Sequence, residues 1–293
     1  MEPSQSEIRN FNSISPSAKS LLFMKGHTTI PYAQKTAELM AQPGQFQPDF
    51  KNRDTTFWAR TLHFESRYLS LDQLLEGLSA TNIIELSSGF SFRGLDRVKN
   101  HAIHYIDTDL PEVIAVKQPL MELLKKEEPD VKGELELLPL NVLDEDEFQK
   151  IVNRLPKGEV TILNEGLLMY FDQAEKEKLC NIIHKLLRER GGCWITADIY
   201  LKNEKGNLKL KLDSKTEEFF RQHRMEENKF ESFEEAESFF NRMGFVIDKE
   251  AVVNHSQLSS LKYFMKYTGF FQLLRFRKAG KIQKSWRLKL AAS

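Results

Sequence analysis

The sequence predicts an α/β fold with a doubly wound, mostly parallel β-sheet and helices on both of its faces. Short apolar runs alternate with longer segments of helical periodicity through the middle of the chain, and this alternation is typical of parallel sheets. With 293 residues, of which 41% are hydrophobic, the chain can bury one large core. No internal repeat is visible in it. We therefore expect one elaborated domain.

The predicted elements follow one another in a regular order. Strands are expected at about 83–84, 102–107, 135–140, 160–163 and 193–197. Helices are expected at about 55–78, from Pro111, after Asp144 and at about 173–190. Proline and acidic residues at the starts of these helices suit the positive N-terminal end of a helix.

The two ends of the chain depart from this alternation. Residues 1–54 are irregular and then mildly helical, which predicts an N-terminal helical cap on a main domain of 55–293. Polar and charged residues at about 200–231 predict a late lid insertion. After a helix that starts near Ser232, late strands are expected within 244–253 and 261–276, with an antiparallel pair among them.

The net charge of the chain indicates no class of partner, but basic residues are concentrated near its C-terminal end. The chain has 42 basic and 42 acidic residues, so its net charge does not indicate a nucleic-acid or membrane partner. The last 19 residues, from Arg275, carry seven Lys or Arg and no acid. They form either a patch for an anionic ligand or, as we favour, a solvated terminal strand and tail.

The cellular compartment and the presence of a metal site are judged from features that the sequence lacks. No window reaches the roughly 18 apolar residues of a membrane span, and the N-terminus has no basic start followed by an apolar run. We expect a cytoplasmic protein. Cys180 and Cys193 show no zinc-type spacing, which predicts reduced, buried thiols and no metal site.

The most informative local feature is an apolar strand that runs into a small turn, Ile-Ile-Glu-Leu-Ser-Ser-Gly at 83–89. Such a turn lets a ligand approach the backbone, and an acid that ends the next strand can bind ribose hydroxyls. Only Gly89 and Gly94 are present, so the dinucleotide fingerprint is absent and an NAD-dependent oxidoreductase is disfavoured. Glu85 at the start of the turn favours S-adenosylmethionine as the cofactor.

Four local patterns in order carry a family resemblance: Phe57-Trp-Ala-Arg60, Glu85-Leu-Ser-Ser-Gly-Phe90, Asp107-Thr-Asp-Leu-Pro-Glu-Val113 and Asn164-Glu-Gly-Leu-Leu-Met-Tyr-Phe171. Over roughly residues 15–200 the chain resembles the leucine carboxyl methyltransferase family. That family includes enzymes that methylate the C-terminal leucine of a protein phosphatase catalytic subunit, and bacterial relatives that act on polyketide-type small molecules. The resemblance implies a Rossmann-like class I methyltransferase fold and S-adenosylmethionine as cofactor.

The resemblance also assigns the charged residues around the methionine part of the cofactor. It implies that Lys19 and Arg60 bind the methionine carboxylate and that Glu165 balances the ammonium or sulfonium charge. Arg60 could instead be a surface cation paired with an acid such as Glu65, and Lys19 a solvated lysine. Glu85 either serves the cofactor or holds the turn by accepting backbone N–H groups.

For the nucleoside, the resemblance implies that Gly89 lines the approach and that Asp109 binds the ribose hydroxyls. Asp107 and Asp109 alternate on the strand end, so only one should face the cofactor, and we favour Asp109. Asn141 and Val142 stand where the family usually has Asp-Leu or Asp-Phe beside the adenine.

The resulting hypothesis is an S-adenosylmethionine-dependent O-methyltransferase that acts on a carboxylate or hydroxyl of a small molecule. A protein C-terminal carboxylate is the alternative acceptor. A carboxylate acceptor needs only a cation such as Arg93 or Lys25 to orient it, whereas a hydroxyl is helped by a base. His27, His63 and Tyr170 are candidates for this base by location alone. Location does not choose among them, and no catalytic residue is assigned.

One departure from the family pattern motivates a different hypothesis. Ser87 and Ser88 stand where the family turn commonly has its first glycine. A serine side chain takes up space and disfavours positive φ. The alternative is therefore a non-catalytic binding protein that keeps the methyltransferase fold. The sequence leaves the oligomeric state open.

Overall fold

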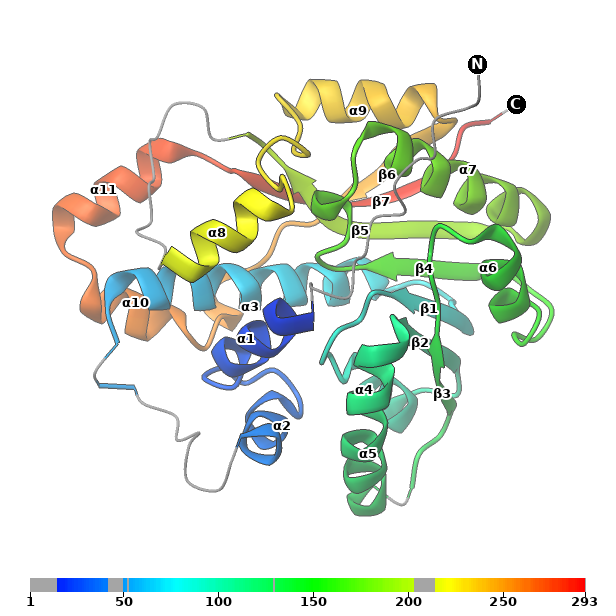
Figure 1. The fold of residues 1–293 in the computed structure, drawn as a ribbon, viewed down its shortest axis with the longest axis horizontal. Coiled ribbons are helices and arrows are strands. Elements are labelled where there is room, and N and C mark those ends of the chain that lie inside the picture. The colour runs from blue at the N-terminus through cyan, green and yellow to red at the C-terminus, as the bar shows by residue number, and fades with distance from the viewer. Residues whose placement is uncertain (1–14, 42–49, 52, 129, 203–213, 293) are drawn as a thin grey trace.

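The computed structural model describes residues 15–41, 50–51, 53–128, 130–202 and 214–292, and within them seven strands form one sheet (Figure 1). The strands are β1 (Asn82–Leu86), β2 (His104–Asp109), β3 (Glu134–Pro139), β4 (Val160–Asn164), β5 (Gly192–Tyr200), β6 (Phe245–Glu250) and β7 (Gln283–Leu290). Their order across the sheet is β3-β2-β1-β4-β5-β7-β6. Neighbours among β1 to β5 are parallel, and β7 is antiparallel to both β5 and β6.

The chain reverses its direction of progress across the sheet at β1. This strand pairs with β2 on one side and with β4 on the other. In open α/β sheets, ligands bind beyond the carboxyl ends of the strands at such a switch point. The ends of β1, β2 and β4 are therefore the place to look for a site.

Helices cover both faces of the sheet. They are α1 (Ser15–Lys25), α2 (Ala33–Met40), α3 (Thr55–Leu75), α4 (Arg93–Asn100), α5 (Pro111–Glu127), α6 (Glu145–Val152), α7 (Gln173–Arg190), α8 (Ser214–Gln222), α9 (Phe233–Arg242), α10 (Leu261–Tyr267) and α11 (Phe270–Ala279). Several begin with a side chain that accepts a hydrogen bond from the first turn: Asp54, Asp144, Asp172 and Ser232. No helix in these described ranges is long and apolar enough to cross a membrane.

Two hydrophobic clusters lie on the two faces of the sheet. Because successive strand residues point to opposite faces, Ile84 belongs to the cluster formed with α6, α7 and α9. Its neighbour Ile83 belongs to the cluster formed with α3, α4 and α5. Trp194 and Ile195 of β5 divide between the clusters in the same way. This confirms the predicted doubly wound α/β fold.

The predicted elements of the middle of the chain are confirmed, and the two cysteines are free and buried. Residues 1–14 and 42–49 of the expected cap, and 203–213 of the expected insertion, lie outside the described residues. From the rest of the insertion, α8 and the turns after it lead to Phe230, which forms a bridge with Leu201.

The prediction of late strands in 251–253 and 261–276 was wrong. Residues 261–267 lie in α10 and 270–276 in α11, and the antiparallel partner of β6 is β7. Glu65 on α3 accepts hydrogen bonds from the backbone N–H and hydroxyl groups of Ser259 and Ser260, which fixes the start of α10. The terminal strand and tail were expected to be solvated, but Trp286 and Leu288 of β7 are buried in the cluster formed with α6, α7 and α9.

Helix α4 was not predicted, and its contact with the sheet depends on the absence of a side chain at Gly94. A Cβ there would lie 2.8 Å from both the Leu135 side chain and the Tyr105 ring. We expect Gly94→Ala to lower the free energy of unfolding by about 1–3 kcal/mol, because the buried ring and its neighbours must shift. Urea denaturation measures this. Gly269→Ala is the control: its Cβ would meet only the Gln272 amide at 3.9 Å, so an equal loss there would contradict the packing argument.

Candidate active site

The turn after β1 is attached to the end of β2. Ser87 and Gly89 both have left-handed backbone conformations, with φ of 49° and 54°. The Ser88 N–H donates to the Thr108 carbonyl at 3.0 Å, and the Gly89 N–H donates to Asp109 Oδ2 at 2.6 Å. The glycine turn and the acid of the second strand, predicted separately from sequence, therefore touch each other.

Helix α1 covers this turn. A Cβ on Gly89 would lie 3.4 Å from the Ala18 Cβ, so the backbone of the turn and α1 are close neighbours. The Ser17 hydroxyl lies 3.2 Å from the Tyr170 hydroxyl, which belongs to the segment after β4. The N-terminal helix thus spans the carboxyl ends of β1 and β4.

Glu165, directly after β4, is bound by three cations. Its Oε1 accepts from Lys25 Nζ at 2.6 Å and from Arg67 Nη2 at 3.1 Å, and its Oε2 accepts from Arg93 Nη2 at 3.1 Å. Burial alone would raise the pKa of this carboxyl, but the three cations outweigh it and lower the pKa to about 2. Three elements, α1, α3 and α4, are joined at this one carboxylate.

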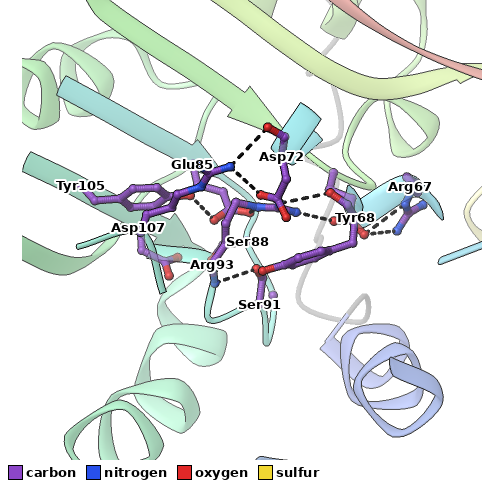
Figure 2. Close-up of polar contacts among 12 residues, drawn as sticks. Arg67, Tyr68, Asp72, Glu85, Ser88, Ser91, Arg93, Tyr105 and Asp107 are labelled. Atoms are coloured by element: carbon purple, nitrogen blue, oxygen red, sulfur yellow. Dashed lines mark hydrogen bonds and ion pairs between the residues drawn. The ribbon is translucent and has the colours of Figure 1, made fainter. Parts of the chain in front are cut away.

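Arg93 connects Glu165 to Glu85 of β1 and Asp72 of α3. Figure 2 shows Arg93 between Glu85 and Asp72. Its guanidinium donates to Asp72 at 2.5 Å, lies 3.4 Å from Glu85 and is centred 3.7 Å from the middle of the Tyr68 ring. Glu85 also accepts from the Tyr105 hydroxyl at 2.6 Å. Burial raises the pKa of Glu85, and Arg93 opposes that shift. Glu85 therefore binds the side chains of Arg93 and Tyr105. The backbone N–H of Gly89 in the turn is held instead by Asp109.

The two acids of β2 have different surroundings. Asp107 is fully buried and paired with Lys117 at 2.7 Å, and Lys117 also donates to Ser88. Asp109 lies at the strand end and accepts hydrogen bonds from the backbone N–H groups of Gly89 and Leu110. Burial raises the pKa of Asp109, and these two hydrogen bonds oppose the shift. Of these two acids, Asp109 is the one at the carboxyl end of β2.

Sequence reasoning missed two supports of this region. Asp198 on β5 accepts from the N–H groups of Gly166, Leu167 and Leu168 and so holds the loop that carries Glu165. Arg67 was also missed, although it lies seven residues after Arg60 on the same helix. That spacing, two helical turns, was the available signal.

Arg67 also leads to a second polar contact. Its Nη1 donates to the Tyr200 hydroxyl at 3.1 Å, and that hydroxyl lies 2.7 Å from His63 Nε2. Burial, with Arg67 adding to it, lowers the pKa of His63 to about 3. Burial raises the pKa of Tyr200 to about 12. At neutral pH this histidine is therefore uncharged and this tyrosine keeps its proton.

Four other predicted residues have different surroundings. Lys19 is exposed, with its ammonium 5.6 Å from the centre of the Phe23 ring, and Arg60 is half buried on α3. The Asn141 side chain is exposed and accepts from the Leu143 N–H. Val142 is buried in the core. Their roles toward a cofactor stay predictions.

No protein-family model and no curated protein sequence matches the chain. Solved structures do resemble it. A DUF574 family protein from Streptomyces avermitilis has a TM-score of 0.55 at 10% identity, covering 94% of this chain and 97% of that one. The methyltransferase domain of bacterial CtHen1-C has a TM-score of 0.51 at 12% identity, covering 79% of this chain and all of that one. The fold is that of a class I methyltransferase.

A further solved structure, the mitomycin 7-O-methyltransferase MmcR, has a TM-score of 0.45 at 13% identity. The alignment covers 80% of this chain but only 57% of that enzyme. Among the described residues, no group of three or more His, Cys, Asp or Glu could hold a metal ion.

The left-handed conformation of Ser87 generates the first prediction for the site. Steric strain destabilises a non-glycine residue in the left-handed region by about 1–2 kcal/mol. Glycine relieves this strain, but the conformational entropy that it loses on folding offsets part of the gain. We expect Ser87→Gly to raise the free energy of unfolding by about 0.5–1 kcal/mol, measured by urea denaturation. Ser87→Ala keeps the strain and should gain nothing. Equal gains from both substitutions would contradict the strain argument.

The three cations around Glu165 lead to a second prediction, on the pH dependence of stability. A carboxyl whose pKa is lowered on folding contributes stability that is present above its ordinary pKa, near 4.5, and is lost as pH falls toward about 2. We expect Glu165→Gln to lower the free energy of unfolding at pH 7 by about 3–5 kcal/mol, because it leaves buried cations uncompensated.

The difference between wild type and Glu165→Gln should shrink as the pH falls from 5 toward 2, which denaturation at several pH values measures. Glu145→Gln breaks an exposed pair with Lys185 and should cost about 0–1 kcal/mol. A difference for Glu165→Gln that stays constant with pH would contradict the lowered pKa.

Proposed function

We propose that this chain is an S-adenosylmethionine-dependent O-methyltransferase that acts on a carboxylate or hydroxyl of a small molecule, and that it belongs with the leucine carboxyl methyltransferase family it resembles. The observation that carries the proposal is the hydrogen bond from the Gly89 N–H to Asp109. It joins the glycine turn and the acid suited to ribose hydroxyls at the switch point of a methyltransferase fold.

The residues around this point fit such a cofactor. Each Asp109 oxygen accepts one backbone N–H and keeps capacity for a hydroxyl donor. The cofactor also carries a carboxylate and two positive groups, and this edge of the sheet holds cations beside acids. Lys25 and Arg67 offer donors for a carboxylate, and Glu165 offers a counter-charge for an ammonium or sulfonium. Lys19 and Arg60 are the further proposed carboxylate ligands.

In the proposed reaction the cofactor supplies a methyl group activated by its sulfonium. The tasks of the chain are to orient the acceptor, to align it with that methyl group and to exclude water. Helix α1 lies over the turn and serves the last task. A carboxylate acceptor is ionised at neutral pH and needs no base. For a hydroxyl acceptor, His63 is a weak base, because burial lowers its pKa to about 3, and no general base is assigned.

Two observations favour a second candidate, a binding protein that keeps the fold without catalysis. Ser87 adopts φ of 49° where glycine would be unstrained, and Glu165 is already saturated by three cations. A cofactor must then compete with internal ion pairs for the same groups. Cofactor affinity separates the two candidates.

Calorimetric titration with S-adenosylmethionine, and separately with S-adenosylhomocysteine, tests the proposal. We expect micromolar binding of both ligands by the wild-type chain. Asp109→Ala should weaken binding about tenfold or more, because the ribose hydroxyls lose a charged acceptor. Arg60→Ala should weaken it similarly by removing a carboxylate ligand.

Asp146→Ala removes an exposed acid of α6 and should leave the affinity unchanged. Wild-type protein that gives neither heat nor a thermal shift would favour the non-catalytic candidate. Binding that survives both Asp109→Ala and Arg60→Ala would show that the site has been assigned to the wrong residues.

A further inference from the structure

The C-terminal part of the chain has an extreme charge bias. Residues 251–293 contain nine Lys or Arg and no Asp or Glu. The chain as a whole has no net charge, so the preceding 250 residues carry a balancing acidic excess. The proposed reaction uses none of these nine cations.

These cations divide into two groups by their place in the fold. Lys281 and Lys284 pair with Glu250, and Arg287 and Lys289 pair with Asp248, so the two acids of β6 offset part of the charge of the four cations on and beside β7. The other five lie on the two helices before β7: Lys262, Lys266, Arg275, Arg277 and Lys278. The sequence thus places five cations and no acid on α10 and α11.

The same two helices expose large apolar side chains. Phe270 and Phe271, at the start of α11, are 70% and 79% exposed, and Met265 on α10 is 51% exposed. Leu274, one turn into α11, is 37% exposed. Adjacent phenylalanines with this exposure are unusual on the surface of a protein that has no partner there.

Helix α10, which leads into α11, is firmly attached to the body. Glu65 of α3 holds the two serines before α10, and the Tyr263 ring of α10 stacks on Trp58 with centroids 4.7 Å apart. In Figure 1, α11 (orange) lies at one side of the molecule, next to α10 and away from α4 and α5. Lys262, Met265 and Lys266 are thus presented from an anchored helix, and Phe270 and Phe271 follow three residues after its end.

We propose that α10 and α11 form a peripheral docking surface for an anionic lipid bilayer. Phenylalanine and leucine side chains that enter the interface, combined with lysine and arginine beside them, match the chemistry of such a surface. Aliphatic side chains such as Met265 and Leu274 offer little to a nucleic-acid backbone. A second copy would bring its own Lys262 and Lys266 to the same face, and this repulsion disfavours a symmetric dimer there.

Co-sedimentation of the full chain with phosphatidylcholine vesicles, with and without phosphatidylglycerol, tests the proposal. We expect binding only to the vesicles that contain phosphatidylglycerol, and weaker binding at higher salt. Phe270→Ser/Phe271→Ser should lower the partition coefficient about tenfold or more, because inserted apolar area is lost. Lys262→Ala/Lys266→Ala should lower it about tenfold.

Matched controls lie on other helices. Val116→Ser/Leu123→Ser removes two exposed apolar side chains of α5, and Lys150→Ala/Lys178→Ala removes two exposed lysines of α6 and α7. Neither should change the partition coefficient, and circular dichroism of every variant reports whether it is folded.

Equal binding to both kinds of vesicle, or no binding to either, would overturn the proposal. So would salt-sensitive binding to a single-stranded oligonucleotide without vesicle binding, which would identify the surface as a nucleic-acid site. Self-association that the phenylalanine substitutions abolish, again without vesicle binding, would make it an interface between copies. The proposal does not depend on S-adenosylmethionine binding, so the calorimetric experiment can fail while this one succeeds.

Discussion

The structure depends on one constraint: the guanidinium of Arg93 is buried and must be compensated. An uncompensated charge in a protein interior costs several kcal/mol, so its partners have to be held in place. Glu85, Asp72 and Glu165 provide the negative charge, and they come from β1, α3 and the loop after β4. Satisfying one side chain therefore sets the relative positions of three separate parts of the chain.

The same constraint shapes the candidate active site. Glu165 is shared between Arg93, Arg67 and Lys25, and Lys25 is the last residue of α1. The N-terminal helix is thus tied to the sheet edge by an ion pair as well as by its packing over the Gly89 turn. Any ligand that enters between α1 and this turn meets groups that already neutralise each other. Its affinity is set by how well it replaces those internal contacts.

Local patterns were sufficient for most of the fold. Hydrophobic periodicity and capping residues such as Asp144 and Ser232 act within a few residues, so they placed the middle strands and helices correctly. The failures lie where a distant contact decides. Residues 261–276 became helices fixed by Glu65, almost 200 residues earlier in the chain, and β7 became a buried strand because it pairs on both sides.

For the site, the sequence by itself determined the chemistry: a glycine turn after β1, an acid ending β2 and an acid following β4. These follow from residue types at strand ends, and parallel strands bring such ends to one edge. Only the tertiary structure decided which groups meet. It joined Gly89 to Asp109 and paired Asp107 with Lys117. It also brought Arg67, through the geometry of α3, to Glu165. The physical reason is that charge compensation acts through space, between residues that sequence separation does not relate.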